Sequence, residues 1–231
     1  MKEVLSFLRD LELNNNREWF NDNKPRYREV QRKWNDFCEE LIGVVGRYDK
    51  DIAMLGLRDC TYRIYRDTRF SNDKSPYKTH FGVFMAPGGK KSMHAGYYFH
   101  VGTGTTGGYP YAHMLASGNY CYDPQTVKIL REDISMGWDE FRKDVLDVAD
   151  VRFVPDMEGA LKRVPREYAA DAPYAEWMRM KNFCLSMNVN DDFILQPRLA
   201  ERVAEVFNTT KPFNDYINRA VDFVNEELKG E

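Results

Sequence analysis

The chain lacks several features that would assign its 231 residues to a familiar class of protein. Its four cysteines, Cys38, Cys60, Cys121 and Cys184, are scattered and form no CxxC pair, so the sequence predicts neither a disulfide framework nor a zinc knuckle. The N-terminal sequence MKEVLSFLRDLEL has charged residues inside its apolar pattern, and no later stretch is apolar over the length of a membrane span. We therefore expect a cytoplasmic protein with reduced thiols and no membrane segment.

Motifs that identify a known type of catalysis are also missing. There is no GxSxG elbow, Cys–His signature or kinase motif. The GTGTTGG run at 102–108 is followed by Tyr109-Pro110 and not by the Gly-Lys-Ser/Thr of a phosphate-binding loop, so we interpret it as a hairpin connection. His80 and His113 could approach His94 or His100 in a folded sheet, but no HxH or HExxH spacing predicts a metal site. Catalytic residues and any cofactor stay unknown.

Composition and periodicity together predict one α+β domain over residues 1–231. The chain is 43% hydrophobic and 30% charged, which is typical of a globular protein, and its length allows a large core without disulfides or metals. No internal repeat or linker divides it. Helical spacing at both ends encloses a central region of period two, so we expect an antiparallel β-sheet packed by long N- and C-terminal helices.

The N-terminal part predicts two helices. Asn15, followed three residues later by Glu18, is a candidate cap for a short helix that turns Trp19 and Phe20 inward. Pro25 suits the first turn of a second helix. The apolar positions of this second helix step by three and four, which places them in the core: Tyr27, Val30, Trp34, Phe37, Leu41 and Val44 or Val45.

The remaining elements follow from the same periodicities. Helical spacing returns from Asp123-Pro124 to Val148, and two closing helices carry apolar positions from Leu195 to Val224. Short runs of period two, separated by turn residues such as Ser71–Pro76 and Pro87-Gly88-Gly89, predict strands. The expected strands are residues 62–70, 81–86, 96–101, 111–115 and 183–189.

The most informative segment is residues 62–81, YRIYRDTRFSNDKSPYKTHF. From 58 to 91, eight Lys and Arg oppose three Asp, a local charge of +5 in a chain of net charge −3 and pI about 5.9. Arginine offers a planar fork of donors to phosphate or carboxylate, and lysine adds a point charge, so this block is a candidate anion site. The candidate ligand-binding residues are Arg63, Arg66, Arg69, Lys74, Tyr77, Lys78 and His80, with Tyr77 or His80 as candidate proton donors.

Arg66 differs from the other arginines by its strand parity. It shares its face of the predicted strand with the apolar Tyr62, Ile64 and Phe70. Arg63 and Arg69 share the other face with Asp67, which we expect to orient one guanidinium. A charge on an apolar face is costly unless it is paired or meets a ligand. We therefore expect Arg66 either to meet a buried acid or to point into a ligand cleft.

Three interpretations of the basic block are open. It could be a structural network of Arg–Asp pairs and tyrosine hydroxyls, or the site of an enzyme or degenerate enzyme acting on a small phosphate- or carboxylate-bearing molecule. It could also be a binding or assembly module for an acidic partner, such as residues 131–158 of a second copy, where nine acids oppose four bases. Arginines interleaved with aromatics suit single-stranded nucleic acid, but the acidic pI and the lack of an RNP or helix-turn-helix signature argue against it.

Several stretches of the chain resemble one known family, Domain of Unknown Function 2461, conserved hypothetical proteins of bacteria and fungi. They are NNNREWF at 14–20, NKPRY at 23–27, RIYRDTRFSNDKSPYKTHF at 63–81, GYYFHV at 96–101, the segment 123–134 with Arg131, and RVPREYAADAP at 163–173 with Lys181. The resemblance implies an α+β cytoplasmic domain and brings no established activity and no catalytic residue. Two places depart from the family pattern: Arg166-Glu167-Tyr168 stands where a Lys-Gly pair is more frequent, and Ala116-Ser117-Gly118 stands where glycines are denser.

Overall fold

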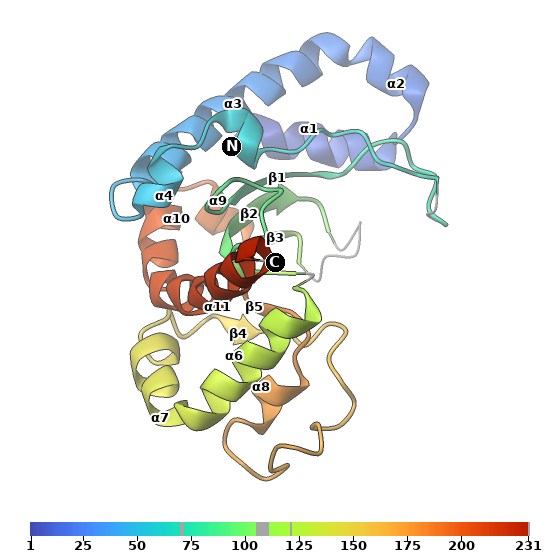
Figure 1. Ribbon diagram of the computed structural model, residues 1–231. Coiled ribbons are helices and arrows are strands. Elements are labelled where there is room, and N and C mark those ends of the chain that lie inside the picture. The colour runs from blue at the N-terminus through green and yellow to red at the C-terminus, as the bar shows by residue number, and fades with distance from the viewer. Residues whose placement is uncertain (70–71, 105–110, 121, 231) are drawn as a thin grey trace.

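The computed structural model describes residues 1–69, 72–104, 111–120 and 122–230 (Figure 1). Its centre is a sheet in which all neighbouring strands are antiparallel, as the sequence predicts. The five strands occur in the order β1-β2-β3-β5-β4. They are β1 (His80–Met85), β2 (Gly96–Gly102), β3 (His113–Asn119), β4 (Val154–Pro155) and β5 (Phe183–Asn188).

Helices from both ends of the chain pack around this sheet, which confirms the α+β fold. Figure 1 shows α1, α2 and α3 as a blue layer along one side, and α6, α7 and α8 gathered near β4 and β5. The N-terminal helices are α1 (Lys2–Leu13), α2 (Arg17–Asp22), α3 (Lys24–Val45), α4 (Lys50–Ala53) and α5 (Leu57–Cys60). The later helices are α6 (Pro124–Met136), α7 (Trp138–Phe141), the π-helical turn η2 (Arg142–Leu146), α8 (Ala175–Arg179), α9 (Asp191–Ile194), α10 (Leu199–Asn208) and α11 (Lys211–Gly230).

The main core lies between the helices and one face of the sheet. Helix α3 has a proline in its first turn and buries the apolar positions that step by three and four, as predicted. Trp34 on this helix is buried and stacks on Phe81 of β1 and Phe99 of β2, with ring centroids 5.6 and 6.2 Å apart. We call this side of the sheet the helix-covered face.

The opposite side of the sheet carries a second, much smaller cluster. Met114, Ala116 and Cys184 are buried there, and Tyr98 and Tyr120 are half-buried and pack against them. These residues alternate along the strands with residues of the main core, as the period of two requires. We call this side the open face of the sheet.

The predicted strand over residues 62–70 is wrong. Phe70 and the following Ser71 lie outside the described residues. One isolated bridge, Thr61 to Val83, comes just before the segment, and a second, Tyr65 to Tyr77, is the only bridge that its described residues make. Around the second bridge the chain folds back on itself: Arg66 N–H donates to Pro76 O (3.0 Å) and Lys78 N–H donates to Ile64 O (2.7 Å). Pro76 has no N–H to return a bond to Arg66, so the ladder does not extend.

Other sequence predictions also need correction. Asn16, not Asn15, caps α2, since its side chain accepts a hydrogen bond from Trp19 N–H at 2.9 Å. The strand predicted over 111–115 starts two residues later and extends to Asn119, and the helical spacing of 123–148 divides into α6, α7 and η2. Helix α1 was not predicted. Residues 105–108 of the glycine-rich run and Cys121 lie outside the described residues.

Cys38, Cys60 and Cys184 are buried and free. In the described part of the chain, no helix combines the length and the apolar composition needed to cross a membrane.

Candidate anion-binding site

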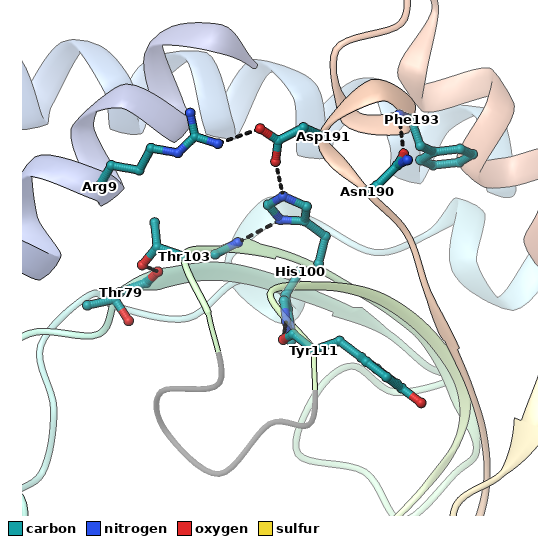
Figure 2. A network of polar contacts seen from close by, with 10 residues as sticks. Arg9, Thr79, His100, Thr103, Tyr111, Asn190, Asp191 and Phe193 are labelled. Atoms are coloured by element: carbon teal, nitrogen blue, oxygen red, sulfur yellow. Dashed lines mark hydrogen bonds and ion pairs between the residues drawn. The ribbon is translucent and has the colours of Figure 1, made fainter.

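Lys78 is held by contacts on both sides of it in the chain. The amide of Asn15 makes two hydrogen bonds to the backbone of Tyr77, donating to the carbonyl (3.0 Å) and accepting from the N–H (3.1 Å). Thr103, just after β2, donates from its hydroxyl to Thr79 O at 3.4 Å (Figure 2). Both neighbours of Lys78 are thus fixed by side chains from distant elements, and this positions the lysine before any ligand arrives.

The ring of Tyr77 belongs to this scaffold. It is 4% exposed and stacks on Phe20 of α2, with ring centroids 3.9 Å apart. Burial raises the pKa of its phenol, so the hydroxyl stays protonated at neutral pH. This stacking gives Tyr77 a structural role beside its place in the lining of a cavity.

A polar network fixes the strand ends beside the scaffold. The carboxylate of Asp191 pairs with the guanidinium of Arg9 (Figure 2). It also lies 2.9 Å from Nε2 of the buried imidazole of His113. The other ring nitrogen of His113, Nδ1, accepts from Gly102 N–H at 3.2 Å. Hydrogen bonds from His113 and Arg9 lower the pKa of Asp191. The network joins α1, α9 and the strand end that carries Thr103.

Two cavities meet at Lys78 and His80. The larger, of about 300 Å³, we call the mixed-charge cavity. It is lined by Glu12, Asn15, Arg66, Asp67, Asp73, Ser75, Tyr77, Lys78, Thr79 and His80. The smaller, of about 150 Å³, we call the Lys78 cavity. It is lined by Tyr62, Arg63, Lys78, His80, Gly82 and Tyr98.

Ion pairs neutralise most charges of the mixed-charge cavity. Arg66 pairs with Asp73, and hydrogen bonds from Ser75 and then Arg66 lower the pKa of that carboxyl. Asp67 pairs with Arg69 at 2.6 Å, as predicted, and this contact lowers the pKa of Asp67 to about 2. Arg66 therefore both meets an acid and faces a cavity, but the Asp73 side chain is 52% exposed and not the buried acid that we considered.

Arg69 and Lys74 lie apart from both cavities. The Arg69 side chain is 76% exposed, and Lys74 is exposed and donates from Nζ to Thr68 O at 2.9 Å. Within the basic block, Arg66 and Arg69 thus pair with acids of the same block. Arg63 and Lys78 instead line the Lys78 cavity.

The Lys78 cavity has an unbalanced positive charge. Arg63 and Lys78 line it, no carboxylate does, and neither cation lies within ion-pair distance of an acid among the described residues. Lys78 Nζ lies over the ring of Tyr62, 5.3 Å from its centroid. Burial, and then the nearby Arg63 and Arg66, lower the pKa of Lys78. An anion entering here would lower the electrostatic cost of holding these cations together.

His80 adds a neutral imidazole to the same cavity. Burial lowers its pKa to about 3, assisted by His100, Lys78 and Arg66, so it is uncharged at neutral pH. Its ring centroid lies 5.4 Å from that of His100, so His80 lies close to one of the two histidines of the 94–100 segment. A neutral imidazole offers one hydrogen-bond donor and one acceptor to a ligand.

Sequence reasoning missed Asn15, Gly82 and Tyr98 as parts of the site. Gly82 leaves room for Tyr98, because a Cβ at Gly82 would lie 2.9 Å from the Tyr98 hydroxyl. The alternation of GYYFHV contained the signal for Tyr98, since it places Tyr98 and His100 on the face opposite Tyr97 and Phe99. Within the described ranges, no group of three or more His, Cys, Asp or Glu side chains could hold a metal ion.

Comparisons with known proteins place the chain in a family without assigning an activity. Neither the search of curated proteins nor the search of solved structures gave a match. A family model described as a conserved hypothetical protein (DUF2461) matches residues 3–216, which include all of α1 except Lys2, the basic block and all strands of the sheet. This match covers nearly the whole chain, so the protein belongs to the DUF2461 family.

Proposed function

We propose that the protein binds a small molecule bearing a phosphate or carboxylate group, and that the anionic group sits in the Lys78 cavity. The observation that carries the proposal is the pair of cations, Arg63 and Lys78, around a hollow whose lining has no carboxylate. Lys78 is half-buried beside the exposed Arg63, and an anion between the two cations would balance a charge that burial and neighbouring cations disfavour. The chain also fixes Lys78 through both neighbouring residues, which suits a binding group.

The residue types fit the chemistry of an oxyanion. The guanidinium of Arg63 can meet two oxygens at once, the ammonium of Lys78 adds a compact charge, and neutral His80 can donate one hydrogen bond. A volume of about 150 Å³ is small for a complete ligand, so the rest of the molecule extends into a neighbouring hollow.

Enzymatic activity and a cytoplasmic location are further parts of this proposal. The lowered pKa values of His80 and Lys78 support the first, since perturbed groups beside a cavity are frequent in catalytic sites. No group with an assigned catalytic role accompanies them. Ligand binding is therefore the function that the geometry supports best.

Replacement of Lys78 by Met tests the binding site. The variant keeps the length and the apolar stem, so inorganic phosphate should bind it about 10- to 100-fold more weakly, the effect of losing a charge-assisted hydrogen bond. Because burial and neighbouring cations disfavour the Lys78 charge, the ligand-free variant should be as stable as the natural protein or more stable. Calorimetric titration and thermal unfolding with and without phosphate measure the two effects.

Lys74→Met is the matched control, because it removes the same charge four residues away and outside both cavities. Its phosphate affinity should stay within about twofold of the natural value. Equal losses in both variants would mean that only net charge matters, and would favour the competing hypothesis of a surface for an acidic partner. A Lys78→Met protein that unfolds readily without ligand would instead show that the lysine is structural.

A further inference from the structure

A second hollow on the open face adjoins the Lys78 cavity. Tyr62 and Tyr98 line both, so the two hollows are neighbours. The second hollow has a volume of about 130 Å³, and we call it the tyrosine cleft. Its lining is completed by Phe84, Met114, Ala116, Gly118, Asn119, Tyr120 and Cys184.

Small residues on β3 create this cleft. Ala116 stands beside Tyr98 of β2 and Ser186 of β5 in the sheet register, and its methyl group leaves most of the space above the strand empty. Gly118 follows on the same face, with φ of +116°. A Cβ at Gly118 would lie 2.0 Å from Phe183 O, so the backbone here excludes any side chain.

The cleft is apolar and carries no charge. Its lining residues include no Asp, Glu, Lys, Arg or His. The hydroxyl of Tyr120 is occupied by Asp156, to which it donates a hydrogen bond. Burial raises the pKa of Cys184 to about 12, so its thiol stays protonated. Four aromatic rings, those of Tyr62, Phe84, Tyr98 and Tyr120, thus surround a hollow about the size of one ring.

We infer that the ligand of the Lys78 cavity is an aromatic phosphate or carboxylate whose ring occupies the tyrosine cleft. The inference rests on the proposed function, because the Lys78 cavity must first hold the anionic group. Positive charge in one hollow and aromatic walls in the other favour a molecule in which an anionic group is joined to an aromatic ring. Aromatic walls favour a flat ring, which packs against them edge-on or offset.

Phenyl phosphate, inorganic phosphate and phenol separate the two contributions. Phenyl phosphate should bind at least about tenfold more tightly than inorganic phosphate, the factor expected for burial of one ring. Phenol, which lacks the anionic group, should bind more weakly than phenyl phosphate. Calorimetric titrations of the full chain with the three probes at one pH and one salt concentration measure this order.

Ala116→Leu tests where the ring sits. The added side chain would fill the tyrosine cleft without reaching the charged groups, so phenyl phosphate should lose its advantage while inorganic phosphate binds as before. Ala170→Leu is the control, because it adds the same volume at an exposed position between β4 and α8. If Ala116→Leu fails to fold, Met114→Ala, which enlarges the cleft, should bind 1-naphthyl phosphate more tightly relative to phenyl phosphate than the natural protein does.

The outcomes distinguish the binding of the anionic group from the binding of the aromatic ring. No binding of inorganic phosphate or of phenyl phosphate would overturn the proposed function itself. Binding of inorganic phosphate with no gain from the phenyl ring would overturn only the aromatic ligand. A phenyl advantage that survives Ala116→Leu, or a naphthyl preference unchanged by Met114→Ala, would place the ring elsewhere and would also overturn the inference.

Discussion

The two faces of the sheet differ in packing, although the same strands form both. On the helix-covered face, β2 presents Tyr97, Phe99 and Val101, each at most 1% exposed and packed in the main core. On the open face, the alternate residue Tyr98 lines two hollows, one beside Gly82 and one beside Ala116. Large side chains facing helices leave no space, and small side chains facing away from the core leave cavities. Adjacent residues of one strand thus lie in the main core and beside the proposed binding site.

The largest expected effect comes from two neighbours that point to opposite faces. Phe99→Ala should lower the free energy of unfolding by about 3–5 kcal/mol, the usual cost of a cavity in a packed core, because its ring contacts Phe37 and Trp34. Tyr98→Ala should cost less than half as much and should weaken phenyl phosphate binding, because Tyr98 lines both ligand hollows. Chemical denaturation and ligand titration of the two variants measure the contrast.

Trp34→Ala should lower the free energy of unfolding by a similar amount to Phe99→Ala, because Trp34 of α3 stacks on Phe99. Similar losses for the Tyr98 and Phe99 variants would show that the open face carries as much stability as the covered face. That result would remove the distinction between them.

A smaller effect, on pH dependence, comes from the open face. Burial lowers the pKa of His100 to about 4 from an ordinary value of 6.5, so the unfolded chain binds the proton more readily than the folded one. The contribution of neutral His100 to the free energy of unfolding should therefore be complete above about pH 7 and should decrease as the pH drops from 6.5 toward 4. The loss from this group alone is about 2 kcal/mol at pH 5.

His100→Gln should remove this part of the pH dependence. The variant can still donate a hydrogen bond to Tyr111 O, which His100 contacts at 3.1 Å from Nε2 (Figure 2). Urea unfolding at pH 5 and pH 8 measures the difference in stability for each protein. An unchanged difference between the two pH values in the variant would assign the acid sensitivity to other groups, of which His80 is the first candidate because burial lowers its pKa as well.

The sequence predicted the covered face better than the open face. Apolar spacing and strand alternation depend on burial, so Trp34, Phe37 and most of the strands could be identified without a structure. The charge excess also located the basic block. Strand alternation could not predict which cations would pair with an acid, because the pairs depend on turns such as the one that brings Asp73 to Arg66. The hollows were out of reach, because they arise from small residues on adjacent strands whose register was unknown.

The smallest expected effect separates two adjacent asparagines. Asn15→Ala removes two hydrogen bonds to the backbone of Tyr77, and Asn16→Ala removes the cap of α2. Each change should lower the free energy of unfolding by about 1–2 kcal/mol, so stability alone will not distinguish them. Phosphate binding should distinguish them, because Asn15 fixes the residue before Lys78 whereas Asn16 lines neither the mixed-charge cavity nor the Lys78 cavity.

We expect Asn15→Ala to weaken phosphate binding severalfold and Asn16→Ala to leave it unchanged, both measured by calorimetry well below the unfolding temperature. Asn15→Asp sharpens the test, since it can accept from Tyr77 N–H but cannot donate to Tyr77 O as the ionised carboxylate. Its negative charge would also face the mixed-charge cavity, which Asn15 lines. It should therefore bind phosphate at least as weakly as the Ala variant. Equal affinities for all three variants and the natural protein would show that Lys78 needs no support from Asn15, and that the Lys78 cavity keeps its shape through β1 and Thr103 alone.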